Sequence, residues 1–200
     1  MSLHVGALLA RGDARSELRA LCDQVGCTMS EKPVSLAVRF DDLTQRGTDE
    51  CGLTLVEGWT VLWGQAGLLS PPLEFVARAP NPQLYVTAEH LAPALAAFSG
   101  NREVYFSISD GTAGTYGLDV YTGGRRTRSL WELEAEVVRD DGAPLSGEAE
   151  FRERLATSEW GMMELLCHQT VPYSTLEQST LDVWQIAWVP VKSRPWWHLW

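Results

Sequence analysis

The sequence predicts an α+β fold: a single domain with a mainly antiparallel sheet of about six strands and helices packed largely on one face. Three observations lead to this prediction. Apolar and polar residues alternate through residues 103–109, which is the period of a half-buried strand. Glycine-containing turns join strand-like segments into hairpins. The strand-like segments also follow one another instead of alternating with helices.

The clearest strand signal is a meander of three strands between residues 103 and 137. The first strand, over residues 103–109, is followed by a second over residues 115–121. The second strand ends at Thr122-Gly123-Gly124, whose glycines can adopt the positive φ that a tight hairpin turn demands.

The third strand of the meander is predicted over residues 130–137. One side of it would be apolar and the other would carry a row of glutamates. The apolar residues are Trp131, Leu133, Ala135 and Val137, and the acidic ones are Glu132, Glu134 and Glu136. A strand of this pattern buries one face and shows water a row of carboxylates.

The remaining elements follow from apolar period, turn residues and caps. A helix over residues 13–25, with Asp13 as its cap, ends at Gly26. Further strands are predicted over residues 34–40, 53–56, 59–64 and 181–191, with Glu57-Gly58 as a turn. Further helices are predicted after Ser146, after Ser158 and within residues 87–98, where Pro93 either kinks the helix or begins it.

The length of 200 residues suits one full-sized domain over residues 1–200. Hydrophobic residues make up 45% and charged residues 21%, which is ordinary globular usage. The proline-rich segment 72–82 is predicted to be a surface connection, because prolines this dense disfavour a central strand or a long helix.

The charge balance restricts the partners that the chain can have. The 26 acidic and 16 basic residues give a net charge of −10, which repels nucleic acid and anionic membranes and attracts a basic protein. Arg11 interrupts the apolar residues 5–10, and no apolar run approaches the roughly 18 residues that span a bilayer. These features predict a cytoplasmic protein without a membrane segment.

The sequence predicts no cofactor and no metal site. The four cysteines, Cys22, Cys27, Cys51 and Cys167, lack the spacing of zinc ligands, and we interpret them as structural thiols rather than disulfides. Glycine-rich phosphate loops and the common hydrolase motifs are absent. The adjacent Cys167 and His168 would project about 100° apart on a helix, so they do not form a catalytic pair by adjacency.

Two groups of residues are predicted to bind a partner. Glu132, Glu134 and Glu136, extended by Asp140 and Asp141, would form an acidic docking surface on the sheet. The C-terminal tail, residues 195–200, carries Trp196, Trp197 and Trp200. Such an apolar end is expected to dock on its own domain or on another chain.

The meander resembles small bacterial immunity-type domains, which protect a cell against a secreted toxin. The similar segments lie between residues 103 and 148 and include Val104-Tyr105-Phe106-Ser107, Gly114-Thr115-Tyr116-Gly117-Leu118-Asp119-Val120-Tyr121 and Asp141-Gly142-Ala143-Pro144-Leu145. The resemblance implies a non-enzymatic bacterial protein that recognises another protein, and it transfers no catalytic residue.

The sequence therefore favours a non-catalytic domain that binds a basic protein partner. Two alternatives remain open. One is a hydrolase or transferase with a site built on a thiol or on paired carboxylates. The other is a structural homodimer sealed by the Trp-rich C-terminus.

Overall fold

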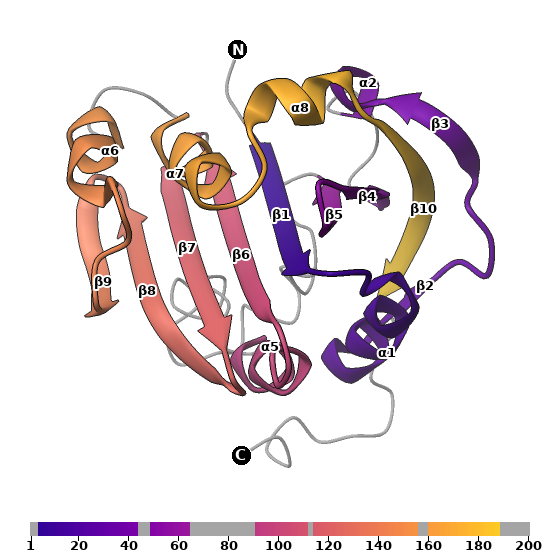
Figure 1. Cartoon of the computed structure of the whole chain (residues 1–200), viewed down its shortest axis with the longest axis horizontal. Helices are drawn as coiled ribbons and strands as arrows, with labels where there is room; N and C mark the ends of the chain where they lie inside the picture. Colours follow the sequence, from indigo (N-terminus) through magenta and orange to yellow (C-terminus); the bar gives the residue numbers. More distant parts are fainter. Residues whose placement is uncertain (1–3, 44–48, 65–90, 112–113, 156–159, 189–200) are drawn as a thin grey trace.

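The computed structural model describes residues 4–43, 49–64, 91–111, 114–155 and 160–188, and these confirm the α+β class (Figure 1). One antiparallel sheet holds ten strands, rather than about six, in the order β2-β10-β4-β5-β1-β6-β7-β8-β9, and β3 also pairs with β10. The strands are β1 (His4–Arg11), β2 (Cys27–Met29), β3 (Ser35–Arg39), β4 (Glu50–Val56), β5 (Trp59–Gly64), β6 (Glu103–Asp110), β7 (Thr115–Thr122), β8 (Arg125–Leu133), β9 (Glu136–Gly142) and β10 (Thr180–Trp188).

Helices cover both faces of this sheet, so the prediction that they pack largely on one face is wrong. The described helices are α1 (Arg15–Val25), α2 (Phe40–Leu43), α5 (Ala92–Phe98), α6 (Glu148–Leu155), α7 (Gly161–Gln169) and α8 (Tyr173–Gln178). The first hydrophobic core contains residues of α2, α6, α7 and α8. The second contains residues of α1 and α5, which lie on the other face (Figure 1).

The central strand β1 explains why two helical layers are needed. Its neighbouring residues Leu8 and Leu9 belong to different cores and are both 0% exposed. A strand buried on both faces is apolar throughout and lacks the two-residue alternation. Residues 5–10 stood out in the sequence only as an apolar run that Arg11 interrupts. In the structure these residues form most of β1, in the middle of the sheet between β5 and β6.

Two predicted hairpin turns are confirmed. Gly123 and Gly124 have φ values of 61° and 78° and join β7 to β8. Glu57 and Gly58, with φ values of 48° and 75°, join β4 to β5. Positive φ at both central residues gives the turn a twist that matches the twist of the strands it connects.

The predicted single strand over residues 130–137 is wrong, because a hairpin turn interrupts it. β8 ends at Leu133 and β9 begins at Glu136. Between them, Glu134 and Ala135 have φ values of 49° and 66°. The alternation in the sequence continues through the two turn residues, so periodicity alone does not reveal the turn, although the turn places Leu133 and Glu136 on the same face.

The predicted helix ends are partly confirmed. Gly26, with a φ of 85°, caps the C-terminus of α1. Asp13 does not cap α1 as an N-cap residue; that position is Ala14, whose N–H donates to Thr60 Oγ1 at 2.8 Å. Pro93 is the second residue of α5, in the first turn, where a missing N–H costs nothing, so the alternative in which the proline begins the helix is correct to within one residue.

The later elements lie close to their predicted positions. β10 covers most of residues 181–191 as far as they are described, and α6 and α7 follow Ser146 and Ser158 by two and three residues. The predicted strand over residues 34–40 is shorter: β3 ends at Arg39 and α2 begins at Phe40. Leu36 of this strand is 69% exposed.

The substitution Gly117→Ala tests the packing of β7 against β8. A Cβ atom at Gly117 would overlap ring atoms of Trp131, which is fully buried. We expect a loss of about 1 to 3 kcal/mol or more in the free energy of unfolding, because overpacking forces a buried ring to move.

Denaturant unfolding measures this loss, and Gly100→Ala is the matched control. A Cβ atom at Gly100 meets only Ala97 O at 3.4 Å. Equal effects of the two substitutions would contradict the tight packing of Trp131 over Gly117.

Candidate functional site: the acidic edge of the sheet

The three glutamates of the predicted acidic row do not share one face. Glu132 is half-buried on β8, Glu134 is exposed in the turn, and Glu136 is exposed at the start of β9. Glu136 pairs with Leu133, the neighbour of Glu132, so Glu132 and Glu136 point to opposite faces. The hairpin turn is the physical reason for this correction.

The turn nevertheless places carboxylates along the outer edge of the sheet, where β9 lies (Figure 1). In β9, Val137 and Val138 are 57% and 40% exposed. Trp131 pairs with Arg139 and Glu132 pairs with Val137, so Val138 is an extra, bulged residue. We call Glu134, Glu136, Val137, Val138 and Asp141 the acidic edge.

The two predicted aspartates have different surroundings. Asp140 Oδ1 accepts a hydrogen bond from Arg128 Nη2 and its Oδ2 accepts one from Arg152 Nη2, both at 2.7 Å. Asp141 is 73% exposed and lies 3.8 Å from Arg139 Nε. Asp140 therefore belongs to an internal ion-pair network, while Asp141 remains on the surface.

A buried ion pair at this edge was not predicted from the sequence. Arg128 of β8 and Glu148 of α6 are each 1% exposed. Two hydrogen bonds join them, from Arg128 Nε to Glu148 Oε2 at 2.9 Å and from Arg128 Nη2 to Glu148 Oε1 at 2.5 Å. Arg128 Nη1 also donates to Asp141 O at 2.7 Å. The pair thus fastens α6 and β9 to β8. The sequence contained one indication of it: Arg128 lies two residues before the buried Leu130 on the same strand, so both side chains point to the same face.

The carboxyl groups of this network are held in the ionised form. Burial alone would raise the pKa of Glu148, but hydrogen bonds from Arg128 and from the Leu145 N–H hold that pKa below its ordinary value. Hydrogen bonds from Arg152 and Arg128 lower the pKa of Asp140. Both groups therefore stabilise the fold above their unfolded pKa values and lose this contribution as the pH falls through their folded values.

A second buried carboxylate, Asp119, lies on β7 and is 0% exposed. Its Oδ1 accepts hydrogen bonds from Ser129 Oγ and Trp131 Nε1, and its Oδ2 accepts one from Tyr121 OH. Arg126 Nη1 lies 3.5 Å from Oδ2. Burial raises the pKa of Asp119, although the hydrogen bonds act in the opposite direction. This satisfied network joins β7 to β8.

Among the described residues, no hydrogen bond joins the Cys167 thiol to a histidine side chain. All four cysteines are free and buried. Burial raises the pKa of Cys167 to about 12, so the reactive thiolate is disfavoured at neutral pH. The His168 ring lies 5.5 Å from the Phe151 ring. Among the described residues, no group of three histidines, cysteines or acidic residues could hold a metal ion.

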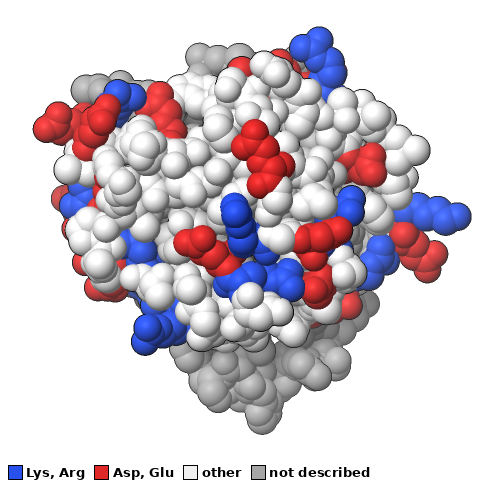
Figure 2. Space-filling view, in the orientation of Figure 1, with Lys and Arg blue, Asp and Glu red and all other residues white. Residues whose placement is uncertain are grey.

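Two predicted segments lie outside the described residues. These are the proline-rich connection 72–82 and the aromatic tail 195–200 with Trp196, Trp197 and Trp200. On the face of the molecule in view, acidic and basic side chains are interleaved rather than gathered in one acidic field (Figure 2).

Comparisons with protein-family models, with curated proteins and with solved structures give no match to this chain. None of the helices described is both long and apolar enough to cross a bilayer.

The buried pair can be tested with Arg128→Met. This change leaves Glu148 buried and unpaired, so we expect a loss of about 3 to 5 kcal/mol in the free energy of unfolding at neutral pH. The loss should shrink as the pH falls, because without Arg128 burial raises the pKa of Glu148 and a protonated carboxyl no longer needs a cation. Denaturant unfolding from neutral to acidic pH measures both effects.

Two controls separate the pair from a general effect of removing arginine. Arg154→Met removes exposed ion pairs to Glu150 and Glu164 and should change little. The double substitution Arg128→Met with Glu148→Leu should recover much of the stability, because it removes both charges. A loss independent of pH would contradict the assigned role of Glu148.

The Asp119 network can be tested with two substitutions. Asp119→Leu leaves three buried donors without an acceptor, and we expect roughly 3 kcal/mol or more of destabilisation. Asp119→Asn keeps one oxygen acceptor and should cost less.

The pH dependence distinguishes a charge effect from a packing effect. Because the folded pKa of Asp119 is raised, its stabilisation is complete only below the unfolded pKa and is lost as the pH rises through the folded value. The Asn variant should therefore improve relative to the wild type as the pH rises above the unfolded pKa of about 4. A constant difference between the two proteins would contradict the raised pKa.

Proposed function

We propose that this chain is a protein-binding domain that recognises a basic segment of a partner protein through the acidic edge. The observation that carries the proposal is the exposed pair Val137 and Val138 on the outermost strand, with the exposed acidic residues Glu134, Glu136 and Asp141 before and after them along the chain. An apolar centre with a charged rim is the usual composition of a protein interface.

The charge of the acidic edge supports a basic partner. In the part of the chain described by the structure, Glu134 and Glu136 take part in no ion pair, so their charges remain available. The net charge of −10 adds a long-range attraction for a positively charged protein. The same charge disfavours nucleic acid.

The rim also argues against a second copy of this chain as the occupant. Two acidic edges placed side by side would bring like charges together, and the bulge at Val138 disturbs regular strand pairing. A strand or loop of a partner that carries lysine or arginine around apolar residues meets neither obstacle. A toxin with a basic surface, the partner that the resemblance to immunity-type domains implies, is one protein of this kind.

Affinity capture with variant baits tests the proposal. The edge bait carries Glu134→Gln, Glu136→Gln and Val137→Ser, and the control bait carries Glu31→Gln and Glu177→Gln. The control carboxylates are exposed and lie elsewhere, one after β2 and the other on α8. We expect the wild type and the control to capture the same basic protein at low salt and the edge bait to bind it at least tenfold more weakly.

The captured protein must also respond to salt. Screening weakens interactions between exposed charges, so high salt should release it from the wild-type bait. Capture that is equal for the wild type and the edge bait, or that is unaffected by salt, would count against the proposal. Capture of another copy of this chain would indicate a dimer instead.

A further inference from the structure

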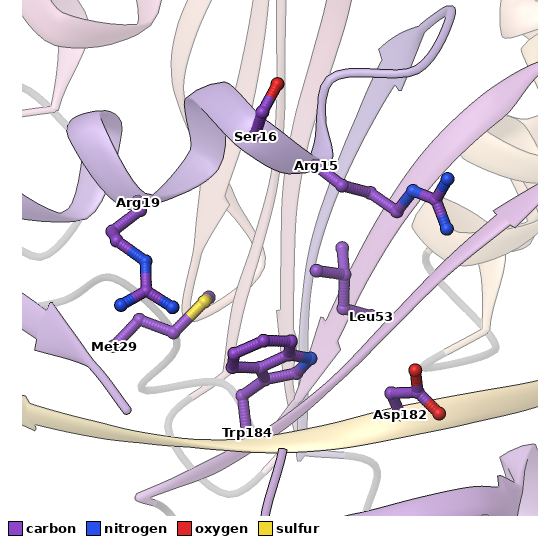
Figure 3. Close-up of a pocket in the computed structure, with 7 residues that line it drawn as sticks. All are labelled: Arg15, Ser16, Arg19, Met29, Leu53, Asp182 and Trp184. Atoms are coloured by element: carbon purple, nitrogen blue, oxygen red, sulfur yellow. The ribbon is translucent and has the colours of Figure 1, made fainter. Parts of the chain in front are cut away.

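A cavity of about 310 Å³ lies at the other end of the sheet from the acidic edge, between α1 and the strands β2, β4 and β10 (Figure 3). Its lining comes from four elements. The residues are Arg15, Ser16 and Arg19 of α1, Met29 of β2, Leu53 of β4, and Asp182 and Trp184 of β10. This volume is within the range of natural small-molecule sites.

The apolar part of the cavity contains a polar atom that has no partner. Met29 and Leu53 are 7% and 6% exposed, and they lie beside the indole ring of Trp184. Trp184 Nε1 is buried and forms no hydrogen bond within the described structure. An indole N–H is a donor only, and because neighbouring atoms cover it, the ring must turn slightly before a molecule bound in the cavity can supply an acceptor. Figure 3 shows Nε1 on the side of the ring that faces Leu53 and Asp182.

One end of the cavity carries a positive charge that no described carboxylate neutralises. The guanidinium carbon of Arg19 lies 5.7 Å from the centre of the Trp184 ring. Arg19 Nη2 donates to the backbone oxygens of Ser30 at 2.9 Å and Glu31 at 3.3 Å, which are neutral acceptors. Among the described residues, its Nε and Nη1 donate to no acceptor, so they can receive a carboxylate.

The opposite end of the cavity carries an excess of negative charge. Figure 3 shows Asp182 and Arg15 beyond the indole nitrogen, on the side away from Arg19. Arg15 pairs with Asp13, whose Oδ2 lies 2.7 Å from Arg15 Nη2, and it also attracts Asp182, so two carboxylates share one guanidinium here. The carboxylate of Asp182 accepts only a 3.3 Å hydrogen bond from the Ala37 N–H among the bonds described. This end therefore suits an ammonium group.

We propose that the cavity binds a short zwitterionic peptide, with a dipeptide of apolar residues as the simplest example. Its carboxylate would bind Arg19, its ammonium group would bind Asp182, and its carbonyl oxygen would accept the Trp184 N–H. Its apolar side chains would pack on Met29 and Leu53. Each polar group of such a ligand meets one group of the cavity, and the charges of the two ends oppose those of the ligand.

Calorimetric titration of the 200-residue chain with leucyl-leucine tests this proposal. We expect saturable binding that weakens at least tenfold when the amino group of the dipeptide is acetylated or when its carboxyl group is amidated. Both blocked forms keep the apolar side chains, so they isolate the two charges. Absence of binding at millimolar dipeptide, or equal binding of free and blocked forms, would overturn the proposal.

Variants assign each end of the ligand to its residue. In Arg19→Met the protein should no longer distinguish the free carboxyl from the amide, yet it should still distinguish the free amine from the acetylated form. Asp182→Asn should show the reverse pattern. An unfolded variant would lose both preferences, so unfolding cannot produce a protein that keeps one preference and loses the other.

Two further variants complete the test. Trp184→Phe keeps a ring but removes the N–H, so it should weaken the free dipeptide several-fold while both charge preferences remain. Arg125→Met removes an exposed arginine of β8, far from the cavity in strand order, and should bind as the wild type does. If Arg19→Met and Arg125→Met bind alike, the assignment of Arg19 is wrong. The site is independent of the acidic edge, so either can fail without the other.

Discussion

The insertion of β1 between β5 and β6 is the constraint on which the rest of this structure depends. On one side of β1 lie the hairpin β4-β5 and the strands around β10, and on the other lies the meander β6 to β9. Gly6 to Ala10 are paired on both sides at once. Both halves of the sheet therefore share a single strand that is buried above and below, which fixes their relative register and requires a helical layer on each face.

The sequence predicted the parts of the fold in which turn chemistry and period agree. The glycines at 58, 123 and 124 marked two hairpins, and Gly26 marked the end of α1. The prediction failed at two places where the fold hides the sequence pattern. β1 lacks the alternation of a strand because both of its faces are buried. The alternation through residues 130–137 covers the ends of two strands, β8 and β9, and the turn at Glu134 and Ala135 between them.

The candidate site shows the same limits of prediction. The acidic character of residues 132–141 was visible in the sequence, but its arrangement depended on a turn formed by two non-glycine residues with positive φ. The exposure of Val137 and Val138 follows from the edge position of β9, which is a tertiary property. Arg128 and Glu148 are residue types that usually lie on the surface, and their ion pair with each other offsets the cost of burying both charges. The cavity under α1 likewise joins residues that are distant in sequence.

The position of β10 has a consequence for the order of events during synthesis. Within the described residues, β2 and β3 join the sheet through β10 alone, and β4 has β10 as one of its two neighbours. A ribosome must therefore translate almost the whole described chain before three early strands can complete their hydrogen bonding. Until then one edge of β4 lacks its partner, and an unpaired strand edge in a partly folded chain is prone to aggregation.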